Sequence, residues 1–249
     1  MNLLAFDTST EFLSLALKLG DNTTTQHLHT GNASSQLILP QIQILFDAAN
    51  IKLKNLHGIA FGAGPGAFTG VRVACGVAQG LGFGANLPVV GVNTLMALAE
   101  ASGHRKVITC LDARMGEIYH AAFIKEGADW LEVSESKVCK PEGAPELDGT
   151  DWIAAGSGWA VYGEALSAIY AQNLSPNLAL NLNQSLPQDS QDLYGQTVHT
   201  PLPTAEAILR LATPIFVAGL AKPASEAMPI YIRNRVALTT LERAAGQRL

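Results

Sequence analysis

Charged residues and cysteines are both scarce in this sequence of 249 residues. Only 15% of the residues are charged and the formal net charge is −5, which argues against a protein that coats nucleic acid through its own electrostatics. Contact with RNA would therefore need a partner. The three cysteines, Cys75, Cys110 and Cys139, form no Cys-x-x-Cys pair, so we expect reduced thiols and a cytoplasmic protein. The N-terminus reaches Asp7 after a short apolar run without a basic segment, so neither a signal peptide nor a membrane span is expected.

A glycine-rich turn at residues 61–72 lacks the charged residues of two common phosphate-binding loops. No lysine occurs between Lys54 and Lys106, which excludes a Walker A loop. The dinucleotide-binding pattern matches at Gly62, Gly64 and Ala67. Residues 80–99 contain no acid that could bind a ribose, however, so a nicotinamide dehydrogenase is not expected.

The same turn joins a predicted buried strand at residues 58–61 to a predicted helix at residues 71–84. Glycines let the backbone adopt positive φ and leave the first N–H groups of the helix uncovered, so an anion can bind there. Tight packing without a ligand explains the glycines equally well. Both interpretations stay open.

Histidine spacing does not fit a metal-dependent enzyme. Two imidazoles that share one metal on a helix lie four residues apart, and no His-x-x-x-His occurs in the sequence. His27 and His29 share one face of a predicted strand but have no acid or cysteine close in sequence. A serine hydrolase is also unsupported, because Gly156-Ser157-Gly158 is not a Gly-x-Ser-x-Gly motif. We therefore expect no metal site and no complete catalytic site.

Hydrophobic patterning predicts an α/β protein made of two tandem related halves. Each half begins with a buried strand that ends at an acid, Asp7 in the first and Asp112 in the second, followed by two further strands of a meander. We place the halves at residues 1–103 and 104–249. The second half is expected to hold a long loop at residues 172–203, a helix from Thr204 to Ala212 closed by Pro214, and a basic tail from Tyr231.

Two helices of the first half carry surfaces that suit a partner. The helix at residues 35–50 has one apolar face for the core, with Ser34 or Ser35 as N-cap and Pro40 near its first turn. Its second apolar stripe consists of Leu37, Ile44 and Ala48, and the following helix carries a stripe of Gly76, Gly80 and Gly84. The glycine stripe indicates either packing inside the chain or a helix-on-helix subunit interface, with a homodimer when the chain is alone.

Two related halves of this kind resemble the actin, hexokinase and Hsp70 superfamily, which has a ribonuclease H-like fold. Within it the chain resembles the TsaB family, also called YeaZ. The resemblance rests on Asp7-Thr8-Ser9, Gly64-Pro65-Gly66-Ala67-Phe68-Thr69-Gly70-Val71-Arg72, Asp112-Ala113-Arg114 and Pro229-Ile230-Tyr231-Ile232-Arg233. It implies a non-catalytic accessory subunit for making threonylcarbamoyladenosine at position 37 of tRNAs that read codons starting with A. The implied partners are the catalytic subunit TsaD, the ATPase TsaE and, through their complex, tRNA.

A small-molecule kinase or a peptidase of the same superfamily remains the alternative. Asp7 and Asp112 lie where sugar kinases of the superfamily hold magnesium and phosphates, but each carboxylate can instead cap its own turn. Arg72 can bind a phosphate or pair with a carboxylate such as Asp7. We expect no tightly bound cofactor, and ATP or ADP only within the complex. The candidate nucleotide- or phosphate-binding residues are Asp7, Thr8, Gly64, Gly66, Thr69 and Arg72.

Overall fold

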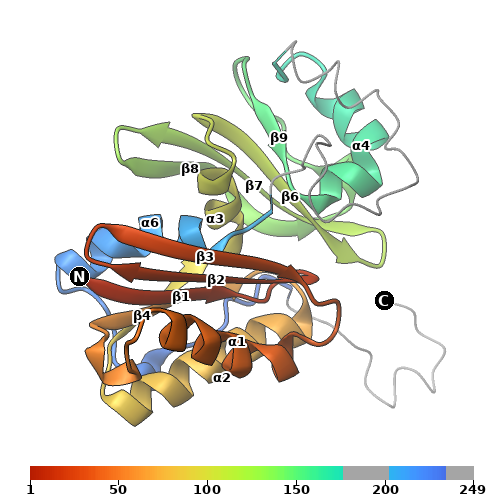
Figure 1. The fold of residues 1–249 in the computed structure, drawn as a ribbon. Helices are drawn as coiled ribbons and strands as arrows, with labels where there is room; N and C mark the ends of the chain where they lie inside the picture. Colours follow the sequence, from red (N-terminus) through yellow and green to blue (C-terminus); the bar gives the residue numbers. More distant parts are fainter. Residues whose placement is uncertain (176–201, 234–249) are drawn as a thin grey trace, which may run out of the picture.

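The computed structural model describes residues 1–175 and 202–233, which form two β-sheets with helices packed around them (Figure 1). Most of the expected loop at residues 172–203 and the basic tail beyond Arg233 lie outside these residues. Within the described part of the chain, no helix is long and apolar enough to cross a membrane.

The first sheet has five strands in the order β3-β2-β1-β4-β5. Its first three strands form the expected antiparallel meander, and β4 pairs parallel with both β1 and β5. The elements of this unit are β1 (Asn2–Asp7), β2 (Phe12–Leu19), β3 (Asn22–His29), α1 (Ser34–Ala48), η1 (Leu53–Asn55), β4 (Gly58–Gly64), α2 (Phe68–Ala85), β5 (Val89–Asn93) and α3 (Thr94–Ala101).

The second sheet repeats this topology with four strands in the order β8-β7-β6-β9. An antiparallel meander again leads to a strand parallel to the first one, and a helix follows. The predicted α/β class with two related units is confirmed. No counterpart of α1 precedes β9, because residues 140–152 hold only a short 3₁₀ turn. The elements are β6 (Lys106–Arg114), β7 (Glu117–Glu126), β8 (Asp129–Cys139), η2 (Pro141–Gly143), β9 (Ile153–Ala155) and α4 (Ser157–Tyr170).

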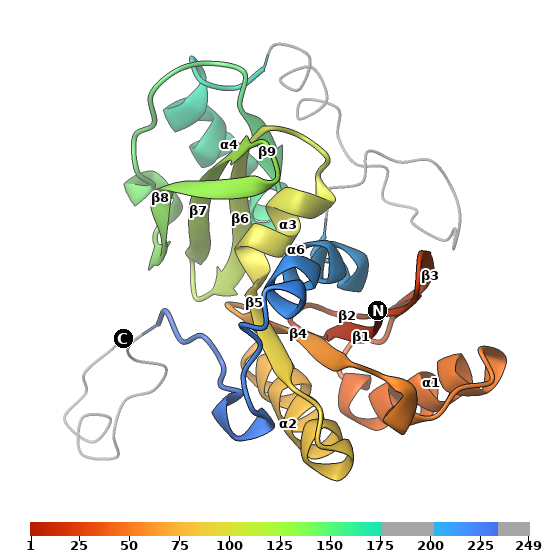
Figure 2. The ribbon, with the colours of Figure 1, turned by 90° about the vertical axis from the view of Figure 1, so that its left-hand side faces the viewer.

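Helices cover both faces of the first sheet. α1 and α2 lie on one face and α6 (Ala205–Val217) lies on the opposite face (Figures 1 and 2). Leu4 and Phe6 pack in the core with α1 and α2, whereas Leu3 and Ala5 pack with α6. Because β1 is buried on both faces, its sequence is an unbroken apolar run and shows no alternation.

The position of α6 differs from the expected division of the chain. The sequence places this helix in the half at residues 104–249, but Ile208 and Ala212 pack on β1, β4 and β5 of the first sheet. After α6 the chain first continues along this unit, since Lys222 forms a β-bridge with Val89. Periodicity identifies the buried face of a helix and carries no information about which sheet covers it.

Two prolines lie farther inside helices than expected. Pro40 is in the second turn of α1, and Pro214 lies within α6, which continues to Val217 and does not end at Ala212. The expected N-cap of α1 is also wrong, because Ala33 occupies that position and the Ser34 hydroxyl lies 2.6 Å from the hydroxyl of Thr30.

Glu100 in α3 connects the two units. Only 8% of its side chain is exposed, and it accepts hydrogen bonds from Lys125 Nζ (2.6 Å) and Trp130 Nε1 (2.8 Å) of the second sheet. Its other oxygen accepts from Arg210 Nε of α6 at 2.7 Å. One buried carboxylate therefore joins α3, the second sheet and the helix that packs on the first sheet.

Candidate functional site

The turn after β1 packs directly on the glycine turn after β4. Thr8 Oγ1 donates to the carbonyl of Gly70 at 2.7 Å, and the N–H of Ala67 donates to the carbonyl of Ser9 at 2.7 Å. A Cβ atom on Gly62, Gly66 or Gly70 would lie closer to the first turn than real Cβ contacts allow. Close packing of the two turns therefore explains why these positions are glycine, whether or not the turn binds a ligand.

Asp7 is buried at this junction with one oxygen unpaired. Its Oδ1 accepts from the N–H and hydroxyl of Ser9 at 3.0 and 2.7 Å, whereas Oδ2 faces Gly62 and has no hydrogen-bond partner. Burial raises the pKa of Asp7 to about 6, against the smaller lowering effect of the Ser9 hydrogen bonds. The expected capping of its own turn is therefore present, but it leaves an expensive buried charge.

Replacing Asp7 with asparagine is expected to stabilise the protein by about 2–3 kcal/mol at neutral pH. Because the pKa of Asp7 is raised, the protonated carboxyl contributes its full share to the free energy of unfolding below pH 3.8, the ordinary pKa. That contribution is lost as pH rises through about 6, where the buried carboxylate ionises. The gain from Asp7→Asn should accordingly vanish in acid, as urea unfolding at several pH values would show. Asp112→Asn is the control at the equivalent position, and it should not stabilise because it removes an ion pair with Arg114. If Asp7→Asn were less stable than the unchanged protein at neutral pH, the buried charge of Asp7 would not be unfavourable as argued here.

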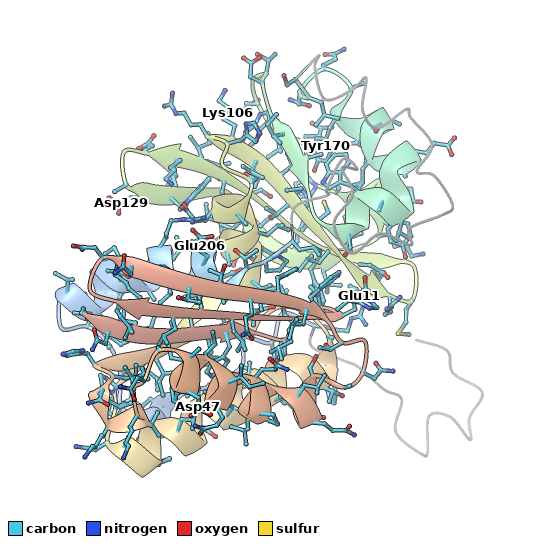
Figure 3. The ribbon with its side chains drawn as sticks, viewed as in Figure 1. Glu11, Asp47, Lys106, Asp129, Tyr170 and Glu206 are labelled. Carbon is cyan, nitrogen blue, oxygen red and sulfur yellow. The ribbon has the colours of Figure 1, made fainter. Side chains whose placement is uncertain are left out.

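A cleft of about 1170 Å³ opens between the two units beside this junction. Its walls are the turns after β1 and β4, the start of α2, the end of β6 and residues 230–233. Glu11, labelled in Figure 3, lies at the end of the first sheet that faces this cleft. Asp112 lies on the opposite wall, where it accepts from the N–H of Arg114 at 2.8 Å and so caps its own turn as expected.

The six candidate phosphate-binding residues do not converge on one point. Thr8, Gly66 and Thr69 line the cleft, but Asp7 does not. Gly64 and Arg72 do not line the cleft either, and the N–H of Gly64 already donates to Thr94 Oγ1 at 3.0 Å. That these residues hold a phosphate stays a prediction.

Arg72 forms no ion pair with Asp7. Its guanidinium carbon lies 3.3 Å from the ring centre of Phe68 and 4.8 Å from that of Tyr231, and Nη1 donates to the carbonyl of Phe68 at 2.9 Å. Sequence reasoning missed both aromatic neighbours. Phe68 precedes Arg72 by one helical turn, so their contact was predictable from the sequence, whereas Tyr231 lies far away in sequence.

The glycine stripe of α2 faces open space. No atom lies within 4 Å of a Cβ built on Gly76, Gly80 or Gly84, so packing on the sheet or on α1 does not explain it. On α1, Ile44 and Ala48 are exposed, while Leu37 is half-buried against the core. Leu39 and Phe83 add exposed apolar side chains.

Histidines and acids do not gather into a metal site in the described residues, since no group of three or more His, Cys, Asp or Glu side chains could hold an ion. The ring of His27 stacks on Phe12 with centres 4.8 Å apart, and burial lowers its pKa. Nε2 of His29 lies 3.7 Å from Oε2 of Glu11.

Comparison with known proteins extends over nearly the whole chain. Residues 23–237 match the family model described as TsaD, tRNA N6-adenosine threonylcarbamoyltransferase. The tRNA threonylcarbamoyladenosine biosynthesis protein TsaB of Escherichia coli is 35% identical, over 95% of this chain and 96% of its own. Its namesake in Haemophilus influenzae is 34% identical, over 95% of each chain.

A solved structure gives the same result. YeaZ from Pseudomonas aeruginosa superimposes with a TM-score of 0.73 at 32% identity, and the match covers 92% of this chain and 99% of YeaZ. The motifs of the two facing turns, the duplicated sheets and these relatives together show that the chain belongs to the TsaB (YeaZ) family of tRNA threonylcarbamoyladenosine biosynthesis proteins.

Proposed function

We propose that this protein is a non-catalytic accessory subunit for threonylcarbamoyl transfer to adenosine 37 of tRNAs that read codons starting with A. It binds and activates the catalytic subunit TsaD, with the ATPase TsaE as a further partner, and tRNA joins through the complex in the cytoplasm. Two observations carry the proposal: the glycine stripe of α2 is open, and the helix α1 carries exposed apolar residues. The two helices are neighbours on the same face of the first sheet (Figure 1). A surface of this kind suits a helix-on-helix interface.

The cleft supports the non-catalytic part of the proposal. Asp7 is covered by its own turn and by Gly62, so its carboxylate is not directed at a ligand in the cleft. We therefore propose that the chain alone binds ATP or ADP weakly if at all, and that nucleotide binds within the complex.

Reconstitution of tRNA modification from purified components tests the function. Threonylcarbamoyladenosine should form when unmodified tRNA and a threonylcarbamoyl donor are mixed with TsaD, TsaE and this chain, and it should fall to background when the chain is omitted. Equal modification without the chain would refute the proposal. Turnover of a sugar by the purified chain with magnesium and ATP would favour the kinase alternative.

Gly80→Leu is expected to weaken both self-association and binding to TsaD by about tenfold or more. Overpacking a tight contact costs about 1–3 kcal/mol, and each 1.4 kcal/mol of binding free energy corresponds to about tenfold in affinity. The monomer should stay folded, because a Cβ at this exposed position would meet nothing within 4 Å outside its own helix backbone. Sedimentation and pull-down measure the two associations, and circular dichroism checks folding.

Gly163→Leu in α4 is the matched control, because it also places a bulky side chain on a helix glycine with open space around it. It should leave both associations unchanged. Normal binding by folded Gly80→Leu would place the interface elsewhere on the molecule.

A further inference from the structure

An exposed surface beside the cleft consists of Phe68, Arg72 and Tyr231, and we call it the Arg72 platform. Phe68 and Tyr231 line the cleft, and Arg72 contacts both of their rings. Phe68 and Tyr231 are 54% and 53% exposed although both are large and aromatic. The guanidinium carbon of Arg72 lies 3.3 Å from the ring centre of Phe68 and 4.8 Å from that of Tyr231. The platform holds an arginine in place and leaves aromatic surface open to a ligand.

Arg72 keeps donors available for an anion. Among the hydrogen bonds of the described residues, Nη1 donates to the carbonyl of Phe68 and its other N–H groups have no partner. No carboxylate of the described residues forms an ion pair with it. A fixed guanidinium with free donors suits a phosphate or carboxylate.

The start of α2 adds donors at the same rim. No side chain caps this helix and its first turn contains no acid. Thr69 is exposed there and lines the cleft together with Phe68. The platform therefore presents aromatic surface next to anion-binding groups, which is the combination that a nucleotide needs: a face for the base and donors for the phosphate.

We propose that the Arg72 platform binds one unpaired nucleotide of an RNA loop, with the base on an aromatic ring and the phosphate on Arg72. This proposal rests on the proposed function, because it assigns to this chain a direct contact with the tRNA of the complex. A protein of net charge −5 does not bind many phosphates at once, and the platform needs to bind only one. Single-stranded loops expose bases for stacking, whereas a duplex hides them.

Fluorescence anisotropy with the full-length chain tests the proposal. The probes are a labelled RNA hairpin with an unpaired loop, a fully paired duplex of the same stem sequence, and ATP as a competitor. At low salt the hairpin should bind and the duplex should not. Phe68→Ala with Tyr231→Ala should weaken hairpin binding about tenfold or more, the range expected for lost base stacking. Arg72→Gln should weaken it too and reduce the slope of log affinity against log salt by about 0.7.

Matched variants separate the platform from general surface effects. Phe83→Ala removes an even more exposed ring from the other end of α2, and Arg105→Gln removes another exposed arginine that donates to a backbone carbonyl. Both should bind the hairpin normally. Tyr231→Phe keeps the ring and should stay within about twofold of the unchanged protein.

Several results would overturn the assignment. Absence of hairpin binding, equal binding of the duplex, or normal binding by the platform variants would each do so. Displacement of the hairpin by ATP at similar concentrations would assign the platform to free nucleotide and not to RNA. Loss of TsaD binding in Arg72→Gln, with hairpin binding intact, would assign it to the protein interface.

Failure of this proposal is distinguishable from failure of the proposed function. If modification requires the chain but the platform variants leave the KM for tRNA and hairpin binding unchanged, only the platform assignment falls. If the hairpin binds through the platform but modification does not require the chain, the accessory function falls and the RNA contact stands.

Discussion

Glu100→Ala is expected to lower the free energy of unfolding by about 2–3 kcal/mol at neutral pH. Removing one partner of a buried ion pair usually destabilises a protein by more than this, about 3–5 kcal/mol, because an uncompensated charge is left buried. Here the side chains of Lys125 and Arg210 are 34% and 45% exposed, so water screens the charges that remain. Urea unfolding would measure the loss.

Glu206→Ala is the matched control, because Glu206 pairs with the same Arg210 at 2.9 Å but is 54% exposed on α6 (Figure 3). Its loss should change stability by about 0.5 kcal/mol or less. An equal effect of the two substitutions would show that burial of Glu100 between the units is not what makes it important.

The effect of Glu100 also has a defined dependence on pH. Burial alone would raise the pKa of Glu100, but hydrogen bonds from Lys125, Trp130 and Arg210 outweigh it and hold the pKa below the ordinary value of 4.5. The stability that the ionised group contributes is thus present above pH 4.5 and is lost as pH falls through the lower folded-state pKa. The difference between the protein and Glu100→Ala should shrink in acid.

Much of the fold was predictable because each strand is a local pattern. The two acid-ended strands at Asp7 and Asp112 and the meanders after them follow from the arrangement of apolar residues over a few positions. The return of α6 to the first sheet was not predictable, since packing between distant segments leaves no periodic trace. Pro214 was misjudged for a related reason, because tertiary packing of α6 outweighs the loss of one helical hydrogen bond.

The candidate site was predictable in its parts and not in its geometry. The glycine turn was recognised, but its contact with the turn at Thr8 and Ser9 pairs residues that are far apart in sequence. Glu100 carries a weak signal, as a lone acid in the apolar helix α3. Nothing in the sequence indicates that Tyr231 reaches Arg72.

Gly70→Ala is expected to destabilise the protein by about 2–3 kcal/mol, as overpacking does in a tight site. Gly70 is helical and its φ is not unusual, so alanine would ordinarily favour α2. A Cβ at this position would instead overlap the carbonyl oxygen of Thr8, which belongs to the backbone and cannot rotate away. The turn after β1 would have to move, and the bond from Thr8 Oγ1 to the Gly70 carbonyl would be strained.

Gly76→Ala supplies the control in the same helix, because nothing lies within 4 Å of a Cβ there. It should stabilise the protein by about 0.5–1 kcal/mol through helix propensity alone. Two identical substitutions in α2 are thus expected to have opposite signs, which thermal or urea unfolding resolves readily. If both stabilise, the turn after β1 is free to shift and the close packing of the two turns does not explain the glycines. If both destabilise at a protein concentration where sedimentation shows only monomer, the glycine stripe of α2 is not open in the free monomer, and the interface proposed for it loses its support.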